Sequence, residues 1–131
     1  MRPNTIARSL AIGNPADGYY TLKTMQESNG AGAAVTDEEV VEGIKLLAES
    51  EGIFAETAGG VTISGLKQMV RAGHVQPDET VVAFITGGGL KTQEAVQGAL
   101  QPPIQIQANI DSFENAWAER RGEAVAAGDP S

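Results

Sequence analysis

A strand-like run that ends in three consecutive glycines constrains the fold of this chain most. Residues 80–86 read Thr-Val-Val-Ala-Phe-Ile-Thr, and Gly87, Gly88 and Gly89 follow directly. β-Branched and aromatic side chains favour extended backbone, and a run this apolar is typical of a strand covered on both faces of a sheet. Glycine has no Cβ, so these residues let the backbone approach a ligand. The sequence therefore predicts a buried strand, a tight turn and a helix whose amino end faces a binding site.

Composition limits the classes of function. The 131 residues suffice for one domain, and the formal net charge of −8 repels nucleic acid and anionic membranes, although such a charge also aids solubility. There is no cysteine, which excludes disulfides and thiol chemistry and fits a reducing cytoplasm. The single histidine, His74, excludes a histidine-rich metal site. No apolar run approaches the roughly 20 residues that span a bilayer. We therefore expect a cytoplasmic protein without membrane or nucleic-acid partners.

Local signals predict three helices before the glycine run. Asn14, which precedes a proline, is typical of a helix start. Thr36 and Glu39 form a capping box for a second helix. A third helix follows residues 53–60 and stops at Gly73. Its apolar side is expected to consist of Ile63, Leu66, Met69 and Val70.

The order of elements predicts an α/β protein with a partial, mostly parallel sheet flanked by helices. Apolar residues alternate over residues 104–108, which predicts a second, half-exposed strand, and a short helix is expected to begin at Asp111. Only the run over residues 80–86 is a strong strand. A parallel strand needs neighbours and helices on both faces. Either the sheet is small and partly exposed, or its remaining strands come from another polypeptide.

Two familiar nucleotide-binding patterns do not fit the glycine run. A phosphate-binding loop needs a glycine directly before Lys-Thr and another five residues earlier, but Leu90 and Ile85 occupy those positions. A dinucleotide-binding fingerprint needs glycine or alanine where Thr92 stands. Taken alone, the glycines are equally consistent with a tight turn between a strand and a helix.

Glu56 is the unusual carboxylate of the chain. It lies in the small-residue run of residues 55–60, where close packing is expected and a charge needs a partner. At a helix start it could instead stabilise the helix dipole. Both interpretations are open from the sequence. His74, beside the helix-ending Gly73, is interpreted as a surface residue rather than a catalytic base.

Three segments together resemble the C-terminal part of the threonine synthase family. They are Asn-Thr-Ile-Ala-Arg-Ser-Leu-Ala-Ile-Gly-Asn-Pro-Ala at residues 4–16, Gly-Ile-Phe-Ala-Glu-Thr-Ala-Gly-Gly at 52–60, and Ile-Thr-Gly-Gly-Gly-Leu-Lys-Thr at 85–92. Their order and spacing agree as well as their residues. The resemblance implies a tryptophan-synthase-β-like fold and pyridoxal phosphate as the cofactor. It assigns residues 1–110 to the family and leaves 111–131 as a C-terminal helix and a frayed tail.

The resemblance also implies the roles of individual residues. Thr86 takes the position whose hydroxyl binds the pyridine nitrogen of pyridoxal phosphate. A hydroxyl partner, unlike a carboxylate, leaves that nitrogen largely unprotonated and weakens the electron sink. The other residues that the resemblance places at the cofactor are Gly87, Gly88 and Gly89 along the ring edge, Ile12, Gly13 and Asn14 beside the ring, and Glu56 near the site.

Two parts of the family site have no counterpart in this sequence. The family's Schiff-base lysine and its glycine- and asparagine-rich phosphate loop lie in an N-terminal portion, and none of the four lysines here has the Ser-Phe-Lys-Asp-like context. The resemblance implies the C-terminal segment of a lyase that converts O-phosphohomoserine and water to threonine and phosphate. Alone, the chain is expected to be inactive.

Three hypotheses about the role of such a chain remain open, and two of them require a partner. As the C-terminal segment of a threonine synthase, it requires the N-terminal half of the enzyme. As one subunit of a split enzyme, it requires a lysine-bearing chain. It could also be a non-catalytic binding or assembly module. Exposed apolar sheet surface further predicts self-association into a homo-oligomer.

Overall fold

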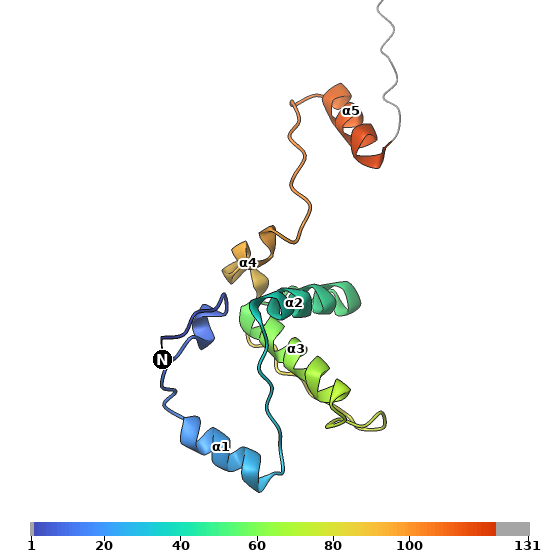
Figure 1. The fold of residues 1–131 in the computed structure, drawn as a ribbon. Helices are drawn as coiled ribbons and strands as arrows, with labels where there is room; N and C mark the ends of the chain where they lie inside the picture. The colour runs from blue at the N-terminus through green and yellow to red at the C-terminus, as the bar shows by residue number, and fades with distance from the viewer. Residues whose placement is uncertain (1, 123–131) are drawn as a thin grey trace, which may run out of the picture. The chain divides into compact units, whose positions relative to one another are not determined.

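Two helices that cross at small residues form the packed core of residues 2–100. The computed structural model describes residues 2–122, and in it α2 (Asp37–Glu51) packs against α3 (Thr57–Arg71) (Figure 1). Gly43 of α2 has no room for a side chain, because a Cβ there would lie 2.5 Å from the carbonyl oxygen of Gly60 in α3. The two backbones therefore approach closely. Val40 and Ile44, on the same face of α2, are almost fully buried.

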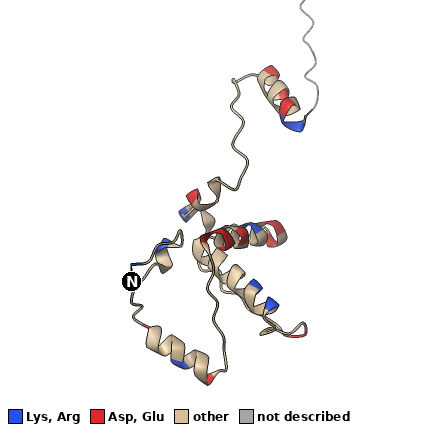
Figure 2. Ribbon diagram, in the orientation of Figure 1, with Lys and Arg blue, Asp and Glu red and all other residues tan. Residues whose placement is uncertain are grey.

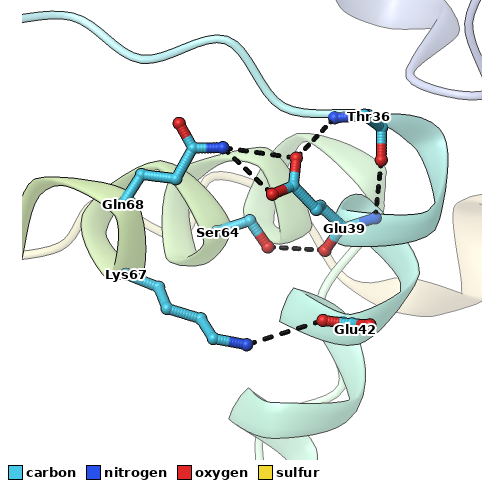
Figure 3. Close-up of polar contacts among 6 residues, drawn as sticks. All are labelled: Thr36, Glu39, Glu42, Ser64, Lys67 and Gln68. Carbon is cyan, nitrogen blue, oxygen red and sulfur yellow. Dashed lines mark hydrogen bonds and ion pairs between the residues drawn. The ribbon is translucent and has the colours of Figure 1, made fainter. Parts of the chain in front are cut away.

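The start of α2 is fixed by hydrogen bonds that also reach α3. The Glu39 backbone N–H donates to Thr36 Oγ1 (3.2 Å) and the Thr36 N–H donates to Glu39 Oε2 (2.8 Å), so the predicted capping box is confirmed. Gln68 Nε2 of α3 donates to both carboxylate oxygens of Glu39, at 3.1 and 3.2 Å (Figure 3). Ser64 Oγ donates to the Glu39 carbonyl oxygen at 2.5 Å. Glu39 thus joins the cap of one helix to the flank of the other.

The buried face of α3 differs from the predicted one. Its buried residues are Thr57, Gly59, Gly60 and Ser64. The apolar residues expected to form the packed side, Ile63, Leu66, Met69 and Val70, are half-buried or, for Val70, 52% exposed. The reason is the short distance to α2, which only small side chains permit. The predicted stop is confirmed: α3 ends at Arg71, and Gly73 follows with a φ of 77°.

The first helix begins later than the sequence predicts. α1 (Gly18–Glu27) follows a turn in which the Gly18 N–H donates to the Pro15 carbonyl oxygen (3.2 Å), so Asn14 does not cap it. Its N-cap, Asp17, makes no side-chain hydrogen bond, and no residue of α1 is buried. Before it, the short helix η1 (Arg8–Leu10) follows a segment held to α2. Thr5 Oγ1 and the Ile6 N–H both donate to Asp37 Oδ1, at 2.5 and 3.1 Å.

The predicted parallel sheet does not form among residues 2–122. Residues 80–86 and 104–108 form no strand, and the only bridge in the described part of the chain is an isolated antiparallel one between Ala55 and Gly88. A strand needs a neighbour for its backbone hydrogen bonds, and the described residues 2–122 supply none for residues 80–86. Val82 and Phe84 are consequently 72% and 78% exposed, although buried positions were predicted.

The segment after the glycines is helical only in short pieces. η2 (Gly89–Lys91) is a single 3-10 turn, and α4 (Glu94–Gln97) follows it. The prediction of one continuous helix was therefore wrong. Val96 of α4 is buried and joins Val40 and Ile44 in the apolar core. This contact places the residues that follow the glycines beside α2.

Packing divides the chain into two compact units, Met1–Leu100 and Gln101–Ser131. The second contains α5 (Ile110–Arg121), whose N-cap Asn109 accepts a hydrogen bond from the Ser112 N–H (2.8 Å). On α5, Phe113 stacks on Trp117 with ring centroids 6.2 Å apart. The predicted boundary at residue 110 concerns the extent of the family resemblance, which this division does not test. The predicted frayed tail lies outside the described residues beyond Gly122.

Acidic side chains are concentrated on α2 (Figure 2). The helix carries six acidic residues and one lysine, whereas the charged residues of α3 are Lys67 and Arg71. Lys67 Nζ lies 3.5 Å from Glu42 Oε2 across the helix pair. Both side chains are exposed, so this ion pair contributes little stability. Among residues 2–122, no helix is long and apolar enough to cross a lipid bilayer.

Replacement of Gly60 by alanine tests the close helix crossing. An added Cβ would meet the Val40 carbonyl oxygen and would lie 2.8 Å from Ile44 Cγ1. We expect Gly60→Ala to lower the free energy of unfolding by about 1–3 kcal/mol, because overpacking forces the helices apart. Chemical denaturation followed by circular dichroism measures the change. Gly98→Ala is the control, since a Cβ at Gly98 meets nothing within 4 Å. Equal stability of the two variants would contradict the expected crossing.

The pH dependence of stability tests the role of Glu39. The backbone N–H of Thr36 and then the amide of Gln68 lower the pKa of Glu39 from its ordinary value of 4.5. A carboxyl group with a lowered folded-state pKa stabilises the fold above its unfolded pKa, and that contribution is lost as the pH falls through the folded pKa. We expect the thermal midpoint of Glu39→Gln to fall less than that of the wild type as the solution is acidified below pH 4.5. Glu38→Gln, in the same turn, should follow the wild type; parallel curves for all three proteins would refute the expectation.

Candidate functional site

The glycine run packs against the residues that precede α3. The Glu56 N–H donates to the Gly87 carbonyl oxygen (3.0 Å), and the Gly89 N–H donates to the Phe54 carbonyl oxygen (2.9 Å). These two bonds flank the bridge between Ala55 and Gly88. Two of the three segments singled out in the sequence, residues 52–60 and 85–92, therefore lie side by side. We call the joined residues 54–57 and 86–92 the clasp.

The three glycines of the clasp have different surroundings. A Cβ on Gly87 would collide with the Glu56 carboxylate, and one on Gly89 would lie 2.6 Å from atoms of the Phe54 ring. A Cβ on Gly88 would meet nothing within 4 Å, and its φ of −80° and ψ of 145° suit any residue. Gly87 and Gly89 are thus required by packing within the chain. Gly88 and Thr86 are exposed.

A second contact ties the clasp to the start of α3. The Thr57 N–H donates to Thr92 Oγ1 at 3.1 Å, and Thr57 is almost fully buried. Thr92 therefore caps α3 from a position 35 residues away. Sequence reasoning missed this role, because a cap supplied from a distant segment leaves no local pattern. The only available signal was that Thr92 belongs to the motif at residues 85–92.

Glu56 has a charge partner. Its side chain is 14% exposed, and Lys91 Nζ lies 3.7 Å from Glu56 Oε2. Glu56 is the N-cap residue of α3 but makes no side-chain capping hydrogen bond. The charge partner expected for a carboxylate in this close-packed run is therefore present, and the N-cap position is also the one that the helix-dipole interpretation requires.

The predicted ring-contacting residues of the third segment are not part of the clasp. Ile12, Gly13 and Asn14 are exposed residues in the loop after η1. Within residues 2–122, no hydrogen bond or ion pair joins this loop to the clasp. Their predicted position beside the cofactor ring stays a prediction, as do the cofactor contacts of Thr86, Glu56 and the glycines.

Three of the four lysines form ion pairs, and the fourth lines a cavity. Lys23, Lys67 and Lys91 form ion pairs with Glu27, Glu42 and Glu56 respectively. Lys45 lines an apolar cavity of about 180 Å³ beside α2. Phe54 also lines this cavity, so its ring contacts Gly89 and the cavity. Across residues 2–122, no group of three or more histidine, aspartate or glutamate side chains could hold a metal ion.

Comparison with known proteins identifies the family. Residues 1–87 match the family model described as pyridoxal-phosphate dependent enzyme, and the chain belongs to this family. The chain is 43% identical over 117 residues to a threonine synthase of Methanocaldococcus jannaschii, an alignment that covers 89% of this chain and 29% of the relative. It is 39% identical to the threonine synthase of Methanosarcina acetivorans (87% and 28% covered) and 45% identical to that of Halalkalibacterium halodurans (68% and 25% covered). The predicted resemblance to threonine synthase is confirmed.

The comparisons also bear on fold and cofactor. The chain spans less than a third of the length of these relatives. Family membership implies a tryptophan-synthase-β-like α/β fold and dependence on pyridoxal phosphate. Two features of the clasp are compatible with one edge of that cofactor: the space beside Gly88 is open, and Thr86 is exposed. The sequence contains no counterpart of the family's imine-forming lysine or phosphate loop.

Alanine substitutions separate the glycines of the clasp. We expect Gly87→Ala and Gly89→Ala each to lower the free energy of unfolding by about 1–3 kcal/mol, since Glu56 or Phe54 must move. Gly88→Ala should change it by less than about 0.5 kcal/mol, because the methyl group meets no neighbour. Urea denaturation provides the values. A Gly88→Ala variant as unstable as Gly87→Ala would show that the surroundings of Gly88 are not open.

Proposed function

We propose that this chain forms the wall of a threonine synthase active site that faces the nitrogen edge of pyridoxal phosphate. The observation that carries the proposal is the clasp, in which a backbone position without a side chain opens outward at Gly88, two residues after an exposed hydroxyl at Thr86. The similarity to threonine synthases over most of this chain supports it. The whole enzyme would convert O-phosphohomoserine and water to threonine and phosphate.

Each residue of the clasp has a part in this proposal. Thr86 hydrogen-bonds the ring nitrogen and orients the ring. Gly88 leaves space for the ring edge. Gly87 and Gly89 have no side chains, so Glu56 can pack against the first and Phe54 against the second, and both stabilise the turn. When bound, pyridoxal phosphate supplies the electron sink that the reaction needs. A hydroxyl partner does not stabilise the protonated ring nitrogen as a carboxylate would. With Thr86 as the partner, the ring therefore withdraws electrons less strongly.

The remaining groups must come from residues that this sequence does not contain. A lysine that bonds the cofactor and a loop that binds its phosphate are needed for catalysis. We infer that a lysine-bearing N-terminal portion, in the same polypeptide or in a separate subunit, completes the site. Residues 80–86 favour such a partner, because their unpaired backbone and exposed Val82 and Phe84 suit pairing with another strand.

A binding or assembly module is the second candidate function. The same unpaired, apolar segment over residues 80–86 supports it, since an exposed strand edge can join copies of the chain into a homo-oligomer. In that case the glycine run would serve as part of an interface rather than a cofactor site.

Reconstitution distinguishes these functions. The purified chain is mixed with pyridoxal phosphate, O-phosphohomoserine and the lysine-bearing N-terminal portion of the M. jannaschii relative, and threonine and phosphate are measured. We expect product only from the mixture. Thr86→Val should lower kcat about tenfold or more through loss of one hydrogen bond to the ring, while Thr86→Ser stays close to wild type.

Thr80→Val is the matched control, because Thr80 is an exposed threonine at the other end of the same extended run. It should leave the rate of the mixture unchanged. A mixture that forms a stable complex but no threonine would favour the assembly module. Full activity of Thr86→Val would refute the role of Thr86.

A further inference from the structure

The ion pair between Lys91 and Glu56 lies beside the residue that follows Thr86. We propose that Lys91 is a positioning residue that acts through Glu56: it neutralises the carboxylate and so keeps an aromatic nitrogen base bound at Thr86 unprotonated. This inference rests on the proposed function, because it requires that Thr86 binds a ring nitrogen. It adds a second determinant of the charge state of the ligand nitrogen, which the proposed function assigns to the Thr86 hydroxyl alone.

The Glu56 carboxylate is held next to Gly87. Its carboxylate occupies the place that a Gly87 side chain would take, and its own backbone N–H is bonded to the Gly87 carbonyl oxygen (3.0 Å). The carboxylate is therefore fixed against the peptide unit next to Thr86. A negative charge near a bound nitrogen base favours the protonated base.

The Glu56 carboxylate is largely withdrawn from water and is paired with one cation. The Glu56 side chain is only 14% exposed, so water screens its charge poorly. Lys91 Nζ, 3.7 Å away, is the cation that compensates it. Glu94, at the start of α4, is exposed, and no ion pair joins it to the clasp among residues 2–122. Lys45 lines the cavity next to Phe54 and forms no ion pair with Glu56.

A second ion pair of the chain provides an internal comparison. Lys23 Nζ lies 3.7 Å from Glu27 Oε1 on α1, the same distance as in the clasp, but its side chains are 53% and 67% exposed. Solvent screens that pair almost completely. The Lys91 side chain is also exposed (66%), so the two pairs differ in the burial of the carboxylate and in location, not in distance or in the exposure of the lysine. Only the pair in the clasp has a carboxylate withdrawn from water beside the proposed ligand position.

The experiment titrates a bound ring nitrogen directly. The full chain is mixed with isotope-labelled pyridoxine phosphate, which has the ring and the phosphate of the cofactor but no aldehyde and so cannot form an imine with any lysine. The NMR shift of the ring nitrogen is followed against pH, and the amide shifts of residues 86–89 report where the probe binds. Lys91→Met should raise the pKa of the bound ring nitrogen by about one unit, because Glu56 is then uncompensated.

Four further variants distinguish this electrostatic effect from a loss of structure. Glu56→Gln combined with Lys91→Met should return the nitrogen pKa to the wild-type value, since both charges are gone. Lys91→Arg should preserve it, and Glu56→Gln alone should lower it or leave it unchanged. Lys23→Met, the matched control, should have no effect. A purely structural role of Lys91 would weaken binding of the probe without moving its pKa.

Two results would overturn the inference. One is a nitrogen pKa that is the same in Lys91→Met and in the wild type, and the other is a wild-type chain that binds the probe without shifts at residues 86–89 or does not bind it. The proposed function is decided separately by threonine formation in the reconstituted mixture. An active mixture with an unshifted nitrogen pKa would refute the role of Lys91 alone.

Discussion

The close crossing of α2 and α3 is the contact on which the rest of the first unit depends. Gly43, Gly60 and Ser64 allow the two backbones to approach, and Val40 and Ile44 fill the space beside the crossing. Any larger residue at the crossing would change the angle and the distance between the helices. Because α3 begins directly after Glu56, the crossing also fixes the residues that support the glycine run.

The clasp holds the glycine run in a defined turn at the start of α3. Two backbone hydrogen bonds and the Thr57–Thr92 bond hold residues 86–92 against the start of α3. Two glycines are needed because Glu56 and Phe54 pack on their α-carbons, and the middle one is left facing open space. The three glycines therefore do not share a single role. Positions packed against other side chains and one open position alternate along these three successive residues.

Local signals predicted the helices well where the chain contains a complete motif. The capping box of Thr36 and Glu39 and the stop at Gly73 depend on hydrogen bonds and backbone angles within a few residues, so the sequence carries all the information. The predicted strand over residues 80–86 is not observed, for the opposite reason. Its composition favours extended backbone, but a sheet depends on partners, and the described chain supplies none.

The sequence by itself determined the family and the helix α2 with its cap. It also singled out Glu56 and the glycine run as members of one set of family motifs. Only the tertiary structure decided that Gly87 and Gly89 pack against Glu56 and Phe54, that Lys91 compensates Glu56, and that Thr92 caps α3. These contacts join positions about thirty-five residues apart. Such pairs leave no periodic pattern in a single sequence. The distance in space between the two paired residues depends on how α2 and α3 pack, and not on the residues that separate the pair in the sequence.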